Sequence, residues 1–174
     1  MDTPTKFAEE IASEFDDDSE FRKSKGYFCT PKQGATLLVK GGGLDLSKTA
    51  DLGAGVGMLT AALVESVASG TKNRHIHCTL YENEVRLIPL LRKVMRHTQR
   101  WAKTKGVNFR YSVRKVDLLE AFRNEEHAYT TIVSNPPFLR VPADSELKKK
   151  TRKFLCTVNL YGSFMEGTLN WTAK

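Results

Sequence analysis

The sequence predicts a single α/β domain built around a mostly parallel sheet. Segments with the period of a strand alternate along the chain with segments whose apolar residues recur at helical spacing. This alternation is typical of parallel strands joined by right-handed crossovers. The length of 174 residues corresponds to one ordinary domain, which is long enough to bury a substantial core.

Composition and termini argue against several other classes of protein. No stretch approaches the ~18 uninterrupted apolar residues of a membrane span. The first four residues are acidic rather than basic and begin no apolar run, so a secretory leader is not expected. Cys29, Cys78 and Cys156 are odd in number and far apart, which predicts neither a disulfide framework nor a metal site. We therefore expect a cytoplasmic protein with reduced thiols and no membrane partner.

The charge is distributed unevenly along the chain. Residues 1–20 carry eight acids and one base, a net charge of −7, so the remaining residues carry 26 bases and 12 acids, a net charge of +14. A body this basic favours a polyanionic partner, with nucleic acid first. The acidic start is either a solvated helix end or a screen for a basic face.

Residues 1–25 are predicted to form an acidic N-terminal helical segment. Pro4 suits the first position of a helix, where its missing N–H has no partner to lose. Phe7, Ile11 and Phe15 recur every fourth residue and form one apolar stripe. The rest of the chain, 26–174, is expected to form the main domain.

The elements of that domain are predicted from local signals. Strands are expected where apolar and β-branched residues run together or alternate, at 49–52, 75–82, 107–116 and 129–134. Helices are expected where apolar residues keep helical spacing, at 31–41, 58–69, 85–105 and 156–171. Glycines end three of these helices, and Pro89 is tolerated because it lies in the opening turn of its helix.

A glycine-rich turn, Asp-Leu-Gly-Ala-Gly-Val-Gly at 51–57, lies between the first strand and its helix. A Walker loop would need Gly-Lys-Ser/Thr, and a dinucleotide fingerprint would need glycine where Met58 stands. The amino-acid moiety of S-adenosylmethionine fits the turn better, because glycines let a ligand approach the backbone and the helix N-terminus offers N–H groups. An ordinary strand–helix turn is the alternative. The contacts expected here are Asp51, facing the ligand's ammonium, and Gly53, Ala54, Gly55 and Gly57.

Two acids follow at the carboxyl ends of the next strands, where cofactors bind in open α/β sheets. Glu82 closes the second strand, and its carboxylate can accept hydrogen bonds from both hydroxyls of a ribose. Asp117 closes the third, and its carboxylate can accept a bond from the exocyclic amine of an adenine. The neighbouring Asn83 and Leu118 complete this expected part of the cofactor site.

Asn135-Pro136-Pro137-Phe138 closes the fourth strand, and two consecutive prolines suit neither a strand nor a helix. They form a rigid turn that can hold the Asn135 side-chain oxygen and the Pro136 carbonyl against an aromatic amine. Two such acceptors favour pyramidal nitrogen and localise its lone pair for attack on the cofactor's methyl group. Phe138 can stack on the target ring. We therefore expect these four residues to be catalytic.

Together these motifs resemble those of class I S-adenosylmethionine-dependent methyltransferases that act on amino nitrogen. The segment Gly-Tyr-Phe-Cys-Thr-Pro at 26–31 is similar to the N-terminal motif of N6-adenine DNA methyltransferases of restriction–modification systems. The resemblance implies a Rossmann-like three-layer sandwich, S-adenosylmethionine as cofactor, and DNA as partner. It also implies that Thr30 and Pro31 hold the methionine end of the cofactor. The target adenine would be flipped out of the duplex, with the basic run at 148–153 placed to clamp phosphates.

The chain departs from that family in its number of strands. The family's sheet has seven strands, whereas this sequence predicts about four and leaves no room for a target-recognition region. We therefore interpret it as the N-terminal part of a methyltransferase, with a second polypeptide supplying the missing strands or with activity lost. The alternatives are methylation of an RNA base or a protein glutamine, or non-catalytic binding of S-adenosylmethionine or DNA.

Overall fold

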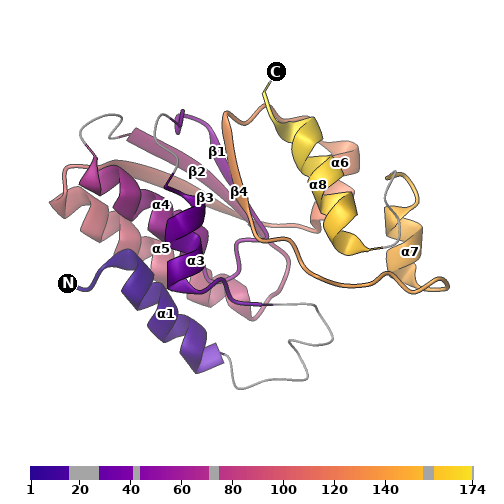
Figure 1. Cartoon of the computed structure of the whole chain (residues 1–174), viewed down its shortest axis with the longest axis horizontal. Coiled ribbons are helices and arrows are strands. Elements are labelled where there is room, and N and C mark those ends of the chain that lie inside the picture. The colour runs from indigo at the N-terminus through magenta and orange to yellow at the C-terminus, as the bar shows by residue number, and fades with distance from the viewer. Residues whose placement is uncertain (16–27, 41–43, 71–74, 155–158, 174) are drawn as a thin grey trace.

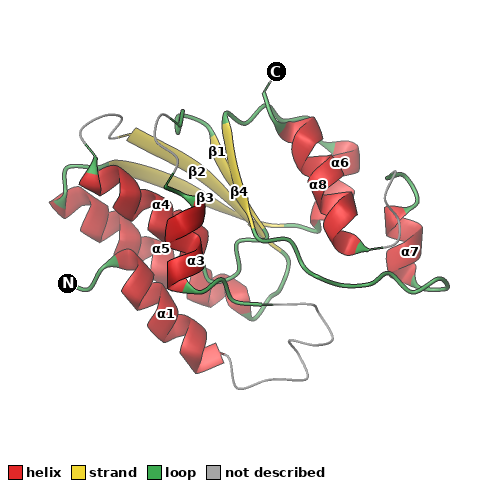
Figure 2. Ribbon diagram, viewed as in Figure 1, coloured by secondary structure: helices red, strands yellow, loops and turns green. Residues whose placement is uncertain are grey.

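The computed structural model describes residues 1–15, 28–40, 44–70, 75–154 and 159–173. Its strands are β1 (Thr49–Leu52), β2 (His75–Glu82), β3 (Asn108–Lys115) and β4 (Thr131–Ser134). Its helices are α1 (Pro4–Phe15), α3 (Lys32–Leu38), α4 (Met58–Ser69), α5 (Leu87–Thr104), α6 (Leu118–Asn124), α7 (Glu146–Thr151) and α8 (Leu160–Trp171). Figure 2 shows the strands gathered into one sheet with helices around it.

All strand pairs in the sheet are parallel, and the order is β3-β2-β1-β4. In β1 all four residues are buried, because helices cover both faces of the sheet there. Its sequence therefore shows no alternation of apolar and polar residues. The register pairs Leu52 with Tyr81 on one side and with Ser134 on the other. The carboxyl ends of the three strands therefore meet at one edge. The predicted α/β class with a parallel sheet is confirmed.

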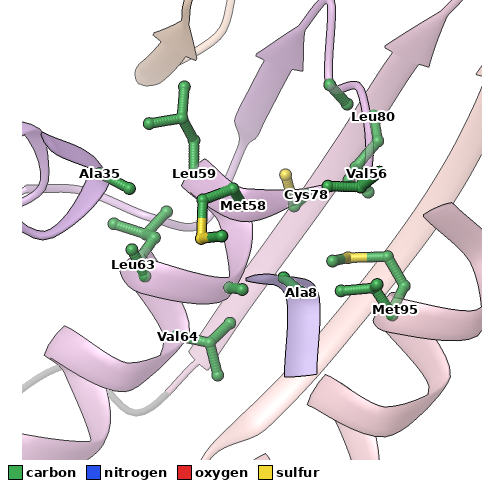
Figure 3. Packing of buried hydrophobic residues seen from close by; sticks show 14 of the residues in the cluster. Ala8, Ala35, Val56, Met58, Leu59, Leu63, Val64, Cys78, Leu80 and Met95 are labelled. Carbon is green, nitrogen blue, oxygen red and sulfur yellow. The ribbon is translucent and has the colours of Figure 1, made fainter. Parts of the chain in front are cut away.

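Helices cover both faces of the sheet (Figure 1). On one face α1, α3, α4 and α5 share a core, and Figure 3 shows part of this cluster, with Ala8 of α1, Val64 of α4 and Met95 of α5. On the other face α6 and α8 pack around Leu52, Tyr81 and Trp171. The N-terminal helix belongs to the first core, because its residues are buried there and the Thr5 amide donates to Glu65 Oε1 of α4 at 2.6 Å.

The strands and helices begin close to their expected positions, with two instructive differences. β4 begins at Thr131 rather than at residue 129, because the Tyr129 amide donates to the Trp171 carbonyl instead of joining the sheet. The last helix begins at Leu160 with Asn159 as its cap, and 155–158 lie outside the described residues. The predicted acidic segment is described only as far as residue 15.

Two short helices, α6 and α7, were not expected. Asp117 caps α6 by accepting from the Leu119 amide, and Ser145 caps α7 by accepting from the Lys148 amide. Both are ordinary N-cap residues, so the signal was present in the sequence. No helix in the described ranges combines the length and the hydropathy that crossing a bilayer would demand.

Candidate functional site

A cavity of about 400 Å³ lies where the carboxyl ends of the strands meet. Each of the four strands is followed by residues that line it, as expected for a ligand site in an open parallel sheet. The cavity brings together most of the predicted residues: Thr30, Gly53, Ala54, Gly55, Glu82, Asn83, Asp117, Leu118, Asn135, Pro136, Pro137 and Phe138. Pro31, Asp51 and Gly57 do not line it.

The glycine turn makes room for a ligand at one position and packs against a helix at another. Gly53 has φ of 75°, and a Cβ added there would meet no atom within 4 Å, so the cavity reaches the backbone. Gly57 has φ of 90°, and a Cβ would lie 2.6 Å from Met95 Cε of α5. The third glycine is thus required by packing and by its left-handed backbone rather than by the ligand.

The N–H groups of the turn are already paired within the fold. Those of Gly53 and Ala54 donate to the Tyr81 carbonyl, and that of Gly55 donates to Glu82 Oε2 at 2.7 Å. These three N–H groups are therefore not available to a ligand, whereas the donors expected from the sequence were those at the start of the following helix. The bonds hold the turn to the end of β2, so its shape does not depend on a ligand.

Glu82 is the residue that joins the turn to the second strand. Besides the Gly55 amide, its carboxylate accepts from the amides of Asn83 and Glu84, each at 2.8 Å from Oε1. Burial raises the pKa of Glu82, while the three amide bonds oppose that rise. Oε2 accepts only one of these bonds and so keeps a second lone pair, and the residue lines the cavity.

Asp51 lies inside the fold and not on the cavity wall. Side chains alternate along a strand, so Ala50 and Leu52 point to the α8 side and Asp51 points to α4. There its Oδ2 accepts from Thr60 Oγ1 at 2.6 Å, and its Oδ1 has no hydrogen-bond partner among the described residues. This placement contradicts the expected contact with the ligand's ammonium. Burial raises the pKa of Asp51 to about 7.

Replacing Asp51 with asparagine is expected to remove a pH dependence of stability. Because the folded-state pKa of about 7 exceeds the ordinary 3.8, the folded chain binds this proton more tightly than the unfolded chain. The contribution is complete below about pH 4 and is lost as the pH rises through 7. Urea unfolding should show the wild type losing roughly 2 kcal/mol relative to Asp51→Asn between pH 5 and pH 8. If the difference in free energy of unfolding between the two proteins stayed the same from pH 5 to pH 8, this prediction would be wrong.

Asn135 is held in one orientation by the segment before α3. Its Nδ2 donates to Thr30 Oγ1 at 3.0 Å and to the Phe28 carbonyl at 3.4 Å. A carbonyl can only accept, so the amide nitrogen must face residue 28. No hydrogen bond to its Oδ1 is found within the described part of the chain. Ser134 Oγ donates to the Leu52 carbonyl at 2.7 Å and ties this turn to β1.

The last residue of the diproline turn already has an aromatic neighbour. The ring of Phe138 is 60% exposed, and one of its faces stacks on Tyr161 of α8 with centroids 5.4 Å apart. An offset stack of this kind leaves the opposite face available to a second ring. Pro136, by contrast, is buried, which keeps the turn rigid.

Asp117 has two hydrogen-bond partners, one nearby in the sequence and one distant. Its Oδ1 caps α6 at 3.0 Å, and its Oδ2 accepts from Lys150 Nζ at 2.6 Å. Lys150 also pairs with Glu120 at 2.8 Å, and these two hydrogen bonds raise its pKa. Lys149 pairs with Glu146. The basic run expected to clamp phosphates is therefore neutralised at two of its lysines by neighbouring carboxylates.

Sequence reasoning missed most of the apolar wall of the cavity. Leu147 of α7 and Leu160 and Phe164 of α8 line it, although none of them belongs to a predicted motif. No local pattern marks these residues, because ordinary core residues of a helix have the same spacing. The other lining residues that were not predicted are Phe28, Cys29, Val56, Met58, Leu59, Tyr81, Glu84, Val116, Leu119 and Leu139.

The fold matches known structures, and the sequence matches a known protein family. Eighteen chains of known structure match, among them one from Listeria monocytogenes described as a class I S-adenosylmethionine-dependent methyltransferase. It is 14% identical, with a TM-score of 0.59, over 84% of this chain and 44% of that chain. This chain therefore spans less than half the length of that structure, and the likeness shows the fold.

The sequence was also compared with curated proteins and with models of protein families. No curated protein matches this sequence. A family model described as the methyltransferase small domain matches residues 18–156, which include both the glycine turn and the diproline turn. The chain belongs to the methyltransferase small domain family, whose class I members use S-adenosylmethionine as cofactor.

Proposed function

We propose that this chain is the cofactor-binding part of a methyltransferase that methylates the N6 amino group of adenine in DNA. The observation that carries the proposal is the placement of Asn135. It lines the same cavity as Gly53 and Gly55, and its amide nitrogen is held by Thr30. Its oxygen is thereby turned away from that anchor and can accept a hydrogen bond from a target amine.

The residues around the cavity fit S-adenosylmethionine. The volume of about 400 Å³ lies within the range of small-molecule sites, and the open space at Gly53 lets a ligand lie against the backbone. Glu82 Oε2 retains one lone pair for a ribose hydroxyl, because the other three acceptor sites of this carboxylate are occupied by backbone amides. Both Asp117 oxygens also keep a second lone pair for an adenine amine. The bound cofactor supplies a methyl group activated by its sulfonium.

The diproline turn supplies what an aromatic amine lacks as a nucleophile. The lone pair of the amine nitrogen is delocalised into the aromatic ring. Hydrogen bonds from the amine's N–H groups to Asn135 Oδ1 and to the Pro136 carbonyl favour the form in which this lone pair is localised. The open face of Phe138 positions the target ring by stacking. The charged amine can lose its proton to water, so no general base is required.

Several features support nucleic acid as the substrate. The chain after residue 20 carries a net charge of +14, which favours a polyanion. The resemblance of 26–31 to DNA adenine methyltransferases favours DNA, although residues 26 and 27 lie outside the described residues. Amino groups of RNA bases and the glutamine amide share the delocalised lone pair. The two acceptors alone do not discriminate among these targets.

The open edge of the sheet bears on the proposed partner. Among the described residues β4 pairs with β1 on one side and with no strand on the other. An unpaired edge offers a row of backbone donors and acceptors to a further strand. We also propose that strands from a second polypeptide pair with the free edge of β4 and complete the target site.

The proposal is tested by calorimetry with S-adenosylmethionine, followed by transfer of a labelled methyl group to duplex DNA, tRNA and protein. We expect binding of the cofactor and N6-methyladenine in digested DNA. Transfer of the label to RNA or to a protein glutamine would show that this molecule, and not DNA, is the substrate. Cofactor binding without transfer would favour a non-catalytic subunit, and absence of both would overturn the proposal.

A further inference from the structure

Positive charge is concentrated on one helix outside the cavity. Between Glu84 and Asp117 the chain contains ten lysines and arginines and no acid. Most of these bases are on α5 and on β3, the strand at the edge of the sheet. Four of them form what we call the α5 stripe, namely Arg92, Arg96, Arg100 and Lys103, and all four side chains are exposed.

The stripe is a straight row along the outer face of α5. At 3.6 residues per turn its members lie within a sector of about 80°, and the row is about 16 Å long. The opposite side of the helix, with Leu91, Val94 and Met95, is buried against the sheet and α4. One flank contacts α1, where Phe7 stacks on His97 with centroids 4.1 Å apart.

No ion pair involves the α5 stripe within the part of the chain that the structure describes. The run at 148–153 is different, since Lys149 and Lys150 are paired with carboxylates. Arginines four residues apart, such as Arg92 and Arg96, repel each other on a helix surface. A polyanion would relieve this repulsion. Within the described residues, therefore, all four bases of the α5 stripe lack an ion pair, whereas two of the five bases of the run are already paired.

We infer that the α5 stripe binds the phosphate backbone of a duplex nucleic acid. Three of its four residues are arginines, whose planar guanidinium donates two parallel hydrogen bonds to a phosphate. A basic amphipathic helix can also bind a membrane surface, but that requires a free apolar face. The apolar face of α5 is buried in the core, which favours nucleic acid.

The stripe is separate from the methyl-transfer cavity. None of its residues lines the cavity, and α5 runs from the carboxyl end of β2 back towards the start of β3. Backbone contacts of this kind contribute affinity and orientation without reading sequence. The inference does not depend on the proposed function, because phosphate binding here requires neither the cofactor nor a flipped base.

The test compares two variants with the same change in charge. One replaces the four residues of the stripe by glutamine, and the control replaces Lys148, Lys149, Arg152 and Lys153 by glutamine. Fluorescence anisotropy without cofactor measures the affinity of the full chain for a labelled duplex of DNA or RNA between 50 and 200 mM salt. Circular dichroism checks folding, and Arg96→Gln with Arg100→Gln is the fallback if the fourfold variant unfolds.

The stripe variant is expected to bind roughly 30-fold more weakly at 0.1 M salt, with the slope of log K against log salt reduced by about 3. The control should keep affinity within about threefold. A preference for DNA or for RNA identifies the duplex, and either supports the inference. Equal losses in the two variants, no binding by the wild type, or stripe-dependent binding only to vesicles of anionic lipid would overturn it.

Discussion

Replacing Asn135 with alanine is expected to lower methyl transfer by roughly 10²–10³-fold while changing the affinity for S-adenosylmethionine less than about threefold. The substitution removes an acceptor that acts on the target amine, and the glycine turn is held independently by Tyr81 and Glu82. Single-turnover rates with saturating cofactor measure the first effect, and calorimetry measures the second.

A second variant tests how Asn135 is oriented. Thr30→Val removes the hydroxyl that accepts from Asn135 Nδ2 at 3.0 Å and keeps the shape of the side chain. The amide would then rotate more freely, so we expect an intermediate loss of transfer rate. If Asn135→Ala weakened cofactor binding as much as it slowed transfer, its role would be to hold the cavity and not the amine.

The largest effect on stability is expected from Gly167→Ala in α8. A Cβ at this buried position would lie 2.2 Å from Phe122 Cδ2 and 2.4 Å from its Cγ, and a rigid ring cannot yield by a small rotation. Phe122 is itself packed edge-on against Phe164 and Trp171. We expect a loss of about 3 kcal/mol, measured by urea unfolding, despite the better helix propensity of alanine.

Gly34→Ala in α3 is the matched control. There the nearest atoms to an added Cβ are 4.0 Å away, on Pro31 and Thr30, so the same chemical change meets no obstacle. Stability should rise by up to about 1 kcal/mol, because alanine restricts the unfolded chain and favours a helix. Similar losses in the two variants would show that the Phe122 contact does not decide the outcome at Gly167.

Much of the fold followed from local patterns. The strands at 49–52 and 75–82 were predicted with the observed bounds, because the first is a short buried run that ends at Gly53 and the second alternates apolar residues along its length. The parallel arrangement followed from the alternation of strands and helices. Since parallel strands bring their carboxyl ends to one edge, the cavity could be expected to contain Gly53, Glu82 and Asn135 before the structure was known.

Other properties depended on partners far away in the sequence. Asp51 faces Thr60 because of the direction that a strand imposes on its side chains, and Asp117 meets Lys150 across 33 residues. The same separation hid the pairing of Lys150, whereas Lys149 of the run pairs with Glu146 only three residues away. The α5 stripe could be read as a row of bases, but only the contacts between the described elements show that none of their acids forms an ion pair with it.

By itself, therefore, the chain's order of residues determined the strands, the turns and which motifs gather at the sheet edge. These depend on backbone geometry and on periods of two to four residues, which neighbouring positions encode directly. Tertiary structure alone decided which carboxylates and cations remain available to a ligand. Whether a charged group is available depends on which residues, often distant in the sequence, pack against it. The free energy of that group is set by all of its neighbours in space.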